Sequence, residues 1–576
     1  MQHTTLFSIY LKKRLFIPLA FIFSALNIIT SCNNTRQPVK SEIVESPALM
    51  NDKVKEMINS SLKYAHSSNG KLDDSVILER SSLLDSLYKE KAYNSLWCNK
   101  ENWLPIGDSL LKFIDESKLF GLFPNDYHFK SLVSIQNRFL NDSLAKSDRK
   151  DAALWARADL MLSDALIKII KDVKSGRLPN DSITLNKDSM LASQFYLDKI
   201  NTVITGNSLS SVIASLEPKH RGYYNLKAGI KKFLDNAAFK KITVIKYPNN
   251  NQSELKSGII KRLFESGYLD STSLSPDSLQ LAVILKKYQQ DKNLTVDGKI
   301  GSQTIHELNS SDEEKFKRIA ITLDRSKMLP EEMPVKYVWV NIPSFNLRLF
   351  VNDSVKILSR IVVGKPKTRT PVLSSSISEI ITYPQWNIPQ SIIVKEILPG
   401  LKRSSHYLEK KGYTLLNSKG EELNPDSINW SKYTKGIPYK VIQGSGDANA
   451  LGVLKFNFNN KYAVYLHDTN QRFYFGLASR ALSHGCVRVQ EWEKLAFFIL
   501  QNETESKGEN GIRFNQADSV KHWLSVKEKH AVPIKNRLPL FIRYFTCDGK
   551  DGNIIFYEDI YDEDRQLADK YFAGKE

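Results

Sequence analysis

The sequence predicts a multidomain protein, with an α-helical scaffold first, then a small three-helix domain, and then a mainly β domain that carries a capping insertion. Three observations lead to this prediction. From about residue 74 to 240, apolar side chains recur at helical intervals, whereas from about 335 they alternate with polar ones, as in strands. Between these regions, a glycine-containing loop separates two short amphipathic helices. The 576 residues also exceed the length of one domain, which is about 150 residues.

The amino terminus has the features of a secretory signal over residues 1–31. Lys12, Lys13 and Arg14 precede a fifteen-residue apolar run, which is shorter than the roughly 20 residues of a membrane span. Small residues stand directly before Cys32, an arrangement that resembles a bacterial lipobox. We therefore expect cleavage before Cys32 and lipidation of its thiol, which would hold the protein on a membrane. An uncleaved anchor helix is the alternative, and both readings place the body of the chain outside the cytoplasm.

The first half of the remaining chain is predicted to be a tether followed by a helical scaffold domain. Residues 32–75 are polar and poor in aromatics, so we expect a flexible tether there. The scaffold is expected over 76–250. Within it, the apolar residues from Ala152 to Val173 follow one helical stripe, and Gly176 and Pro179 end that helix. No catalytic pattern is visible here, so we assign this domain a supporting role.

A small three-helix domain is predicted over residues 251–312. Its second helix is amphipathic from Leu281 to Tyr288, and the loop that follows contains Asp297 and Gly298. Glycine suits a loop that must turn tightly between two helices. A helical linker over 313–334, which returns to the scaffold, is expected to lead into the β domain.

The β domain is expected over residues 335–546. Tyr337 to Ile342 and Asn346 to Val351 alternate as strands do. Strand signals are sparser over 386–452, and long insertions of this kind often act as lids or binding loops. We expect this insertion to cap a site, the alternative being a surface excursion without function. Residues 547–576 are predicted to be a strand and a charged surface tail.

The chain is strongly basic, with a formal net charge of +18 and a pI near 9.3. Such a chain is attracted to anionic polymers or surfaces. The sequence contains no helix-turn-helix, RRM or zinc-finger pattern, so we expect no nucleic-acid partner. Anionic polymers of a cell envelope would suit the same charge, and a lysine-rich solvated surface is the simplest explanation.

A thiol and two histidines form the candidate catalytic group. If the stretch around Cys486 is extended, His484, Cys486 and Arg488 share one face, and two cations beside a thiol would stabilise the nucleophilic thiolate. Gly485 leaves room for a substrate to approach the backbone. A β-branched and aromatic segment ends at the second histidine, His467. A buried thiol with two hydrogen-bonded histidines is the alternative, and a zinc site is less favoured because a fourth ligand is missing.

Three cysteines follow Cys32, namely Cys98, Cys486 and Cys547. An exported protein normally pairs its structural cysteines, and an odd number leaves at least one thiol free or intermolecular. We predict that Cys486 is the free thiol. Pairing between Cys98 and Cys547 is left open.

The pattern Ser-His-Gly-Cys-Val-Arg, preceded by Tyr-Leu-His-Asp-Thr, resembles the signature of the L,D-transpeptidase (YkuD-type) catalytic domain. The longer context, from about residue 75 to 565, resembles the YcbB-like subfamily, which has a scaffold domain. The catalytic signature is matched by His467, Ser483, His484, Gly485, Cys486 and Arg488.

This resemblance implies acyl transfer on the stem peptides of peptidoglycan. Cys486 would attack the carbonyl of the third residue, D-alanine would leave, and the amine of a second stem would resolve the thioester into a 3→3 cross-link. Neither a metal nor another cofactor is expected. Resolution by water (an L,D-carboxypeptidase), attachment of a protein to peptidoglycan, and a catalytically silent wall-binding scaffold are the alternatives.

The resemblance also implies roles for single residues. His467 is expected to be the proton acceptor and donor, oriented by Asp468 or a nearby backbone carbonyl, and His484 is the alternative base. The N–H groups of Gly485 and Cys486 are the expected oxyanion donors. Arg488 is expected to bind a stem-peptide carboxylate or to form a structural salt bridge. The remaining residues predicted to line the substrate site are Ser483, Tyr465 and Trp386.

The three-helix domain resembles the peptidoglycan-binding domain type 1, through Gln289, Asp297-Gly298, Gly301 and Thr304. A three-helix unit that only packs is the alternative. Together these resemblances imply a membrane-anchored lipoprotein in the periplasm of a Gram-negative-type envelope. They leave open whether other cell-wall synthesis proteins are partners.

Overall fold

The structure is a computed structural model. It describes residues 39–73, 76–99, 102–144, 150–179, 191–206, 208–271, 274–292, 294–501, 506–507, 513–514 and 516–574. The predicted signal peptide and Cys32 lie outside these residues. Among the helices that the structure describes, none combines the length and the apolar character needed to cross a membrane.

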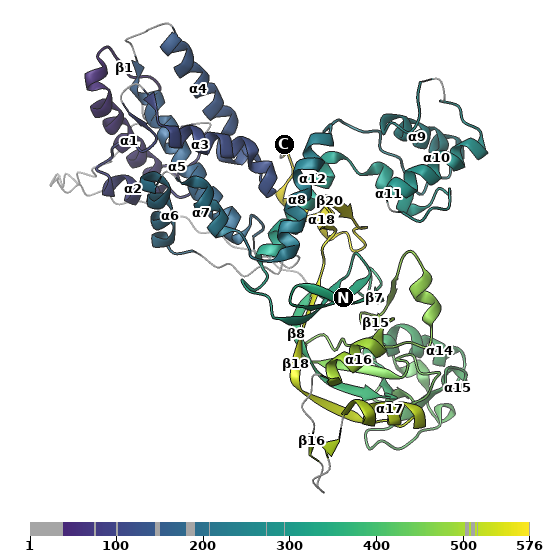
Figure 1. Ribbon diagram of the computed structural model, residues 1–576. Coiled ribbons are helices and arrows are strands. Elements are labelled where there is room, and N and C mark those ends of the chain that lie inside the picture. Colours follow the sequence, from purple (N-terminus) through teal and green to yellow (C-terminus); the bar gives the residue numbers. More distant parts are fainter. Residues whose placement is uncertain are drawn as a thin grey trace, which may run out of the picture.

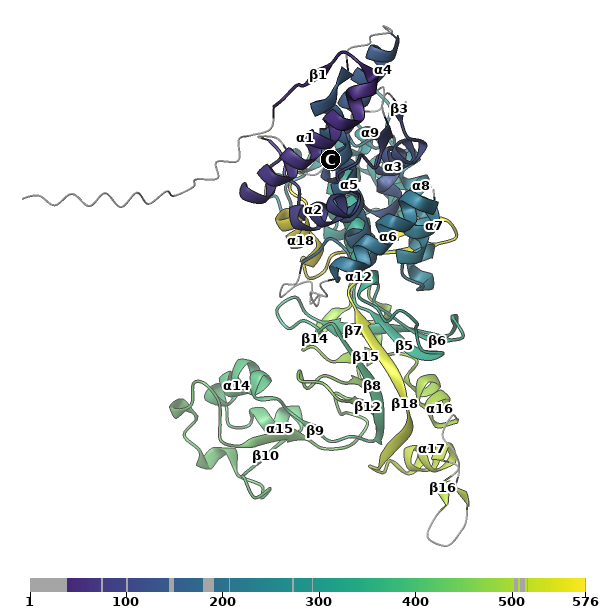
Figure 2. The same ribbon diagram turned by 90° about the vertical axis from the view of Figure 1, so that its left-hand side faces the viewer.

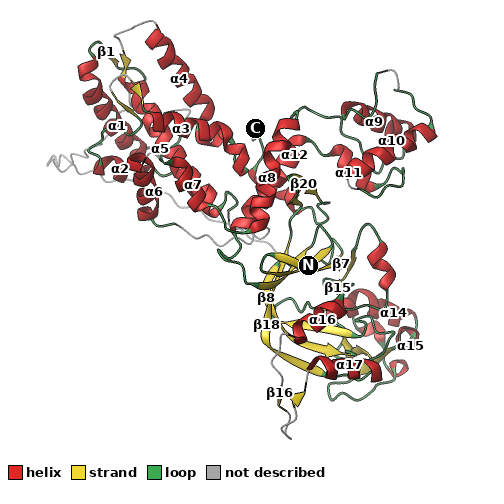
Figure 3. Ribbon diagram, viewed as in Figure 1, coloured by secondary structure: helices red, strands yellow, loops and turns green. Residues whose placement is uncertain are grey.

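The predicted order of a helical region and a mainly β domain is confirmed (Figures 1 and 3). In Figure 1 helices α1 to α7 and the three-helix domain lie on either side of α8 and of α12, which spans Asp312–Lys327, and the β domain lies below them. The amino-terminal helices are α1 Met50–Ser67, α2 Ser81–Glu90, α3 Pro105–Asp115, α4 Phe129–Leu144, α5 Ala152–Ser175, α6 Ser193–Gly206, α7 Leu209–Leu216 and α8 Arg221–Asn236. Short strands join them: β1 Ile43–Val44, β2 Cys98–Asn99, β3 Asn102–Trp103 and β4 Lys150–Asp151.

Helix α5 is the centre of the helical domain, because it is buried along nearly its whole length. The Asp151 carboxylate caps its amino terminus by accepting the Leu154 N–H. One polar residue within α5, Asp159, is buried and accepts the N–H groups of Leu96 and Trp97 at 3.0 and 2.9 Å. These bonds replace the water that the carboxylate loses on burial.

The prediction of a flexible tether over 32–75 is wrong for most of that range. Helix α1 packs on α5 and buries its apolar face, which includes Met50, Val54, Ile58 and Leu62. Strand β1 pairs with β4 in antiparallel register. The helical spacing of these apolar residues was hidden by the polar residues between them, which stay on the exposed face.

The three-helix domain has its own small core. Its helices are α9 Gln252–Glu265, α10 Ser278–Asp291 and α11 Ser302–Asn309. The Gln289 side chain closes the loop between α10 and α11. Its amide donates to Asp297 Oδ1 and Thr304 Oγ1, and its oxygen accepts the N–H of Gly298 at 2.8 Å. The residues of the expected peptidoglycan-binding motif therefore hold the loop, and ligand binding by this domain remains a proposal.

The β domain is built on one nine-stranded sheet with the order β14-β7-β15-β13-β12-β8-β18-β5-β6. Because β6 also pairs with β7, the sheet closes on itself around a buried core. Its strands are β5 Lys336–Asn341, β6 Asn346–Val351, β7 Ser354–Gly364, β8 Leu373–Thr382, β12 Leu454–Phe458, β13 Leu466–His467, β14 Ala481–Ser483, β15 Val487–Val489 and β18 Ala531–Arg543. Helices α16 Trp492–Gln501 and α17 Gln516–Val526 pack on it, and β16 Ser506–Lys507 pairs with β17 Arg513–Phe514.

The insertion folds as a separate lobe with its own core, and Figure 2 shows it projecting from the sheet on the side away from α16 and α17. Strands β9 Trp386–Asn387 and β10 Tyr413–Leu416 flank β11 Lys440–Gln443 in a small antiparallel sheet. The lobe's helices are α13 Gln390–Ile392, a π-helical turn over Ile393–Ile397, α14 Leu398–Arg403 and α15 Tyr407–Lys411.

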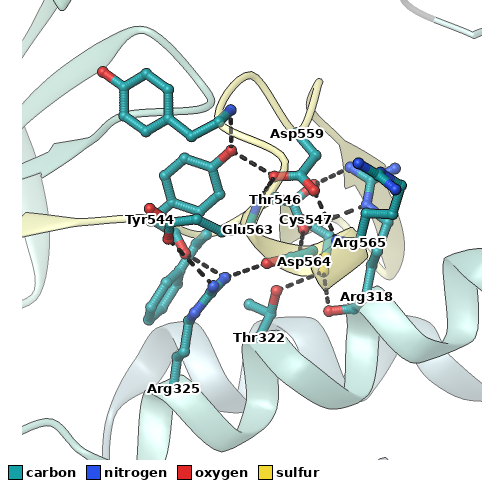
Figure 4. Close-up of polar contacts among 12 residues, drawn as sticks. Arg318, Thr322, Arg325, Tyr544, Thr546, Cys547, Asp559, Glu563, Asp564 and Arg565 are labelled. Atoms are coloured by element: carbon teal, nitrogen blue, oxygen red, sulfur yellow. Dashed lines mark hydrogen bonds and ion pairs between the residues drawn. The ribbon is translucent and has the colours of Figure 1, made fainter. Parts of the chain in front are cut away.

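The predicted surface tail is instead part of the junction between the domains. Strands β19 Cys547–Lys550 and β20 Asn553–Phe556 pack on α8, and α18 Glu563–Tyr571 packs on α12, which spans Asp312–Lys327. Arg325 of α12 donates to the Asp564 carboxylate at 2.5 Å and to the Tyr544 carbonyl at 2.8 Å (Figure 4). The charge of this segment predicts a surface tail because the partner of Asp564 lies 239 residues earlier in the chain and is not visible in the local sequence.

The question of a disulfide is also resolved by the structure. Cys98 is buried in the helical domain and Cys547 at the junction, and both are free thiols, as is Cys486. Burial raises the pKa of both Cys98 and Cys547. These two thiols are therefore poor nucleophiles.

Candidate active site

Cys486 lies in a tight turn between β14 and β15, and not in one continuous strand. Val487 and Val489 point into the core, as the alternation predicts. Gly485 has a φ of +123°, a conformation that side chains disfavour, and this kink ends the expected extended stretch before Cys486. His484 and Cys486 consequently do not share a strand face.

Ser483 stabilises this turn from within. Its hydroxyl donates to the Cys486 carbonyl at 2.6 Å and accepts the Gly485 N–H at 3.1 Å. Only 3% of Ser483 is exposed, so the prediction that it contacts substrate is not supported by its position. The Gly485 N–H is likewise occupied by this hydroxyl, which contradicts its predicted role as an oxyanion donor.

His467 lies on the strand next to the nucleophile turn, because β13 pairs in parallel with β15 and places His467 opposite Arg488, two residues after Cys486. The residue is buried, and its Nδ1–H donates to the Asp468 carbonyl at 2.5 Å. That bond fixes the tautomer and leaves Nε2 as the proton acceptor. Of the two orienting groups that the sequence left open, the backbone carbonyl is the one used, since the Asp468 carboxylate pairs with Arg472.

Burial, assisted by the positive charge of Arg488, lowers the pKa of His467 to about 3. The imidazole is therefore neutral at neutral pH, as a general base must be. Burial also raises the pKa of the Cys486 thiol, although the Tyr465 hydroxyl and the charges of Lys455 and Arg488 act in the opposite direction. The resting groups are thus a neutral thiol and a neutral imidazole, so the thiolate forms only when its proton is transferred.

Tyr465 and Trp386 connect the nucleophile to the insertion. The Tyr465 hydroxyl interacts with the Cys486 thiol and with the Trp386 side chain on β9. The Tyr465 ring also stands edge-on to the His467 ring, with centroids 5.6 Å apart. The structure therefore brings the two predicted substrate-site residues together, with Tyr465 at the thiol and Trp386 beside Tyr465, and the insertion reaches Tyr465 through Trp386.

Arg488 is half-buried, and its guanidinium lies over the Tyr474 ring at 5.2 Å. Among the residues that the structure describes, Nε and Nη1 of Arg488 are buried without a hydrogen-bond partner. A structural salt bridge, one of the two roles predicted for this residue, would have satisfied these atoms. A buried guanidinium edge with unused donors is suited to binding a carboxylate or a carbonyl.

His484 does not join the catalytic group. It is exposed, and its Nε2 lies 2.5 Å from the Glu396 carboxylate in the π-helical turn of the insertion. This contact directs the ring toward the insertion. The alternative assignment of His484 as the base is therefore not supported, whereas a role in holding the insertion against the nucleophile turn fits the contact.

Sequence reasoning missed Lys455 as a member of the site. It lies on β12 directly opposite His467, and its ammonium stands 4.0 Å above the Tyr465 ring. Burial lowers its pKa, and the Cys486 charge acts against this effect. Pairing the strand that contains Lys455 with the strand that ends at His467 would have indicated this position, since cross-strand partners share a face. Tyr474 and Glu396 had no comparable signal in the sequence.

Replacing Lys455 with methionine is expected to raise the pKa of Cys486, because one nearby positive charge that favours the thiolate is lost. The pH midpoint of Cys486 alkylation by iodoacetamide should move up by about one unit. Lys455→Arg keeps the charge and serves as the matched control, with a midpoint close to that of the unchanged protein. Identical midpoints for the methionine variant and the unchanged protein would contradict this prediction.

Comparison with known proteins gives matches to both main regions of the chain. Residues 82–229 match the family described as a scaffold domain, and residues 335–505 match the L,D-transpeptidase catalytic domain (YkuD). A putative L,D-transpeptidase of Haemophilus influenzae is 35% identical over 250 residues, which cover 43% of this chain and 48% of that protein. The chain thus matches about half the length of this relative.

A solved structure, an L,D-transpeptidase from Mycobacterium smegmatis, is 12% identical and covers 36% of this chain and 58% of its own. Its TM-score of 0.17 is too low to support an argument about the fold. The two family matches rest on the same segments that hold the helical core and the Cys486–His467 pair. The chain therefore combines a scaffold domain with a catalytic domain of the L,D-transpeptidase (YkuD) family.

Proposed function

We propose that this protein is an L,D-transpeptidase that forms 3→3 cross-links between peptidoglycan stem peptides. The observation that best supports the proposal is the position of a neutral, tautomerically fixed His467 on the strand beside the Cys486 turn. A thiol suits two successive acyl transfers, because it is a strong nucleophile when deprotonated and a good leaving group afterwards.

In the first step, His467 takes the thiol proton as Cys486 attacks the carbonyl of the third stem residue. The C–S bond forms, the bond to D-alanine breaks, and the proton on His467 passes to the departing amine. In the second step, the side-chain amine of another stem attacks the thioester. His467 then removes a proton from that amine and returns one to the sulfur, so that the free enzyme is restored.

Arg488 is proposed to bind a carboxylate or carbonyl of the donor stem with its free Nε and Nη1 donors. Trp386 and Tyr465 would form the wall of the donor site, and the insertion would exclude water from the thioester. Exclusion of water favours an amine acceptor over hydrolysis, which supports cross-linking over the carboxypeptidase alternative. The N–H of Cys486 remains the proposed oxyanion donor.

We further propose that the protein acts in the cell envelope, attached to a membrane through a lipid on Cys32. The three-helix domain would add affinity for peptidoglycan. The net charge of +18 suits an anionic wall polymer. Transfer to an amine of an attached protein would use the same acyl-enzyme and differs only in the acceptor. A silent binding role would leave the base and the nucleophile without a use.

The test is product analysis by mass spectrometry after the purified full chain is incubated with disaccharide-tetrapeptide. A dimer that has lost one D-alanine, with a Cys486 thioester detected in the intact protein, is expected. Tripeptide alone would move the assignment to an L,D-carboxypeptidase. If protein shown to be folded gives neither the cross-linked product nor the Cys486 adduct, the proposal is overturned.

A further inference from the structure

We propose that Tyr561, in the segment that follows β20, is a positioning residue for the nucleophile turn, acting through the loop of residues 364–370. This inference rests on the proposed function of Cys486 as the nucleophile. The match to the catalytic-domain family ends at residue 505, so Tyr561 lies outside the segment that this family match covers. Tyr561 also lies in the carboxy-terminal segment, where the sequence predicts only a strand and a surface tail.

The loop of residues 364–370 holds the backbone on either side of His484. The N–H of Lys365 and the hydroxyl of Thr368 both donate to the Ser483 carbonyl, at 2.9 and 3.0 Å. The hydroxyl of Thr370 donates to the Gly485 carbonyl at 2.8 Å. The position of the turn that presents Cys486 therefore follows the position of this loop.

The Tyr561 hydroxyl joins the two ends of the same loop. It donates to the Gly364 carbonyl at 2.7 Å and accepts the Thr370 N–H at 3.0 Å. Thr370 also accepts the Gly364 N–H at 2.9 Å through the same hydroxyl that reaches Gly485. Tyr561 is 1% exposed, so water cannot readily replace its hydroxyl.

Tyr561 is itself held by the junction. Its N–H donates to the Tyr544 hydroxyl at 2.8 Å, and the two rings stack with centroids 5.5 Å apart. The Tyr544 hydroxyl donates to Asp559, and the backbone carbonyl of Tyr544 accepts from Arg325 of α12, as Figure 4 shows. A continuous series of hydrogen bonds thus runs from a helix packed on the scaffold to the Gly485 carbonyl.

The turn needs external support because Gly485 has an unusual conformation, with a φ of +123°. Nucleophiles must be held within about 0.5 Å of their productive position, and a shift of about 1 Å can cost roughly a hundredfold in rate. Removing one hydroxyl at the base of the loop should therefore lower the rate of reaction at Cys486 without removing any group that contacts the substrate.

The experiment compares Tyr561→Phe with Tyr127→Phe. Tyr127 is also fully buried, and its hydroxyl donates to the Asp172 carboxylate at 2.7 Å within the scaffold, so the same chemical change is made at an equally buried tyrosine that does not contact the loop. We expect Tyr561→Phe to lower kcat on disaccharide-tetrapeptide about tenfold with KM changed less than about twofold. We expect its pH profile of Cys486 alkylation by iodoacetamide to differ from those of the unchanged protein and of Tyr127→Phe.

Alkylation decides the inference, because it requires no substrate. If Tyr561→Phe gives the same alkylation profile as Tyr127→Phe, the inference is overturned. If the profile changes but the unchanged protein makes no cross-linked product, the proposed function fails and the positioning role stands. Should Tyr561→Phe fail to fold, Thr370→Val removes the hydroxyl that reaches Gly485 and tests the same link by the same measurement.

Discussion

Cys486→Ala is expected to lose at least about 10⁴-fold of the acyl-transfer rate, with no thioester in the intact protein. Each bond-forming step of the proposed reaction passes through the sulfur, and no other group at the site can replace it. The side chain is small and contacts the core only in part, so the fold should be retained. Product analysis and intact-protein mass spectrometry on disaccharide-tetrapeptide measure the effect.

The matched control for this variant is Cys98→Ala. Cys98 is a buried free thiol in the helical domain, where its sulfur contacts Ser95 and Asp159. This control should lower thermal stability modestly and keep the rate per folded molecule. Turnover by Cys486→Ala at more than one hundredth of the normal rate would show that the nucleophile has been assigned wrongly.

His467→Gln is expected to lower the rate by about 10²- to 10⁴-fold, because general base catalysis typically contributes this much. Glutamine can still donate to the Asp468 carbonyl, so the loop should keep its structure, but it cannot accept the thiol proton. His484→Gln makes the same change at the exposed histidine that pairs with Glu396. His484→Gln should lower the acyl-transfer rate less than about tenfold. A greater loss of rate for His484→Gln than for His467→Gln would favour His484 as the base.

The variant His467→Gln also gives a prediction of how the stability of the protein depends on pH. The pKa of His467 is about 3 in the folded protein and about 6.5 in the unfolded chain. Between these values the unfolded chain binds a proton that the folded protein excludes, so His467 lowers the free energy of unfolding as the pH falls below 6.5. At pH 5 this loss is about 2 kcal/mol. Urea unfolding at pH 7 and pH 5 should show a smaller decrease for His467→Gln than for the unchanged protein.

The placement of His467 on the strand beside the Cys486 turn could be predicted because the sequence signals for it are local. A strand that ends at His467 and a strand that begins after Cys486 lie side by side in the sheet. Each of these strands can be recognised from a short run of neighbouring residues. The protonation state could not be predicted, because it depends on burial. Tyr465 and Lys455, which act on the thiol, come from different parts of the chain, and Trp386, which contacts Tyr465, belongs to the insertion.

The errors at the two ends of the chain have a common cause. The polar stretch before the scaffold contains α1, and the charged stretch after the β domain contains α18, and both are stabilised by distant partners. Asp564 can be buried because its ion-pair partner, Arg325, lies beside it in the fold although it is 239 positions away in the sequence. The composition of a segment predicts whether it would be exposed on its own. Whether a charged residue is buried depends instead on the partner that the fold places beside it.

The insertion enters and leaves the β domain at one place. Strands β9 and β11 pair directly, with Asn387 opposite Ile442, so the two ends of the lobe are neighbours while its core is its own. A segment attached in this way can be lengthened, shortened or exchanged between related chains without rebuilding the sheet beneath it. Descendants of one ancestral enzyme could therefore acquire new acceptors by inheriting a different lobe over an unchanged nucleophile.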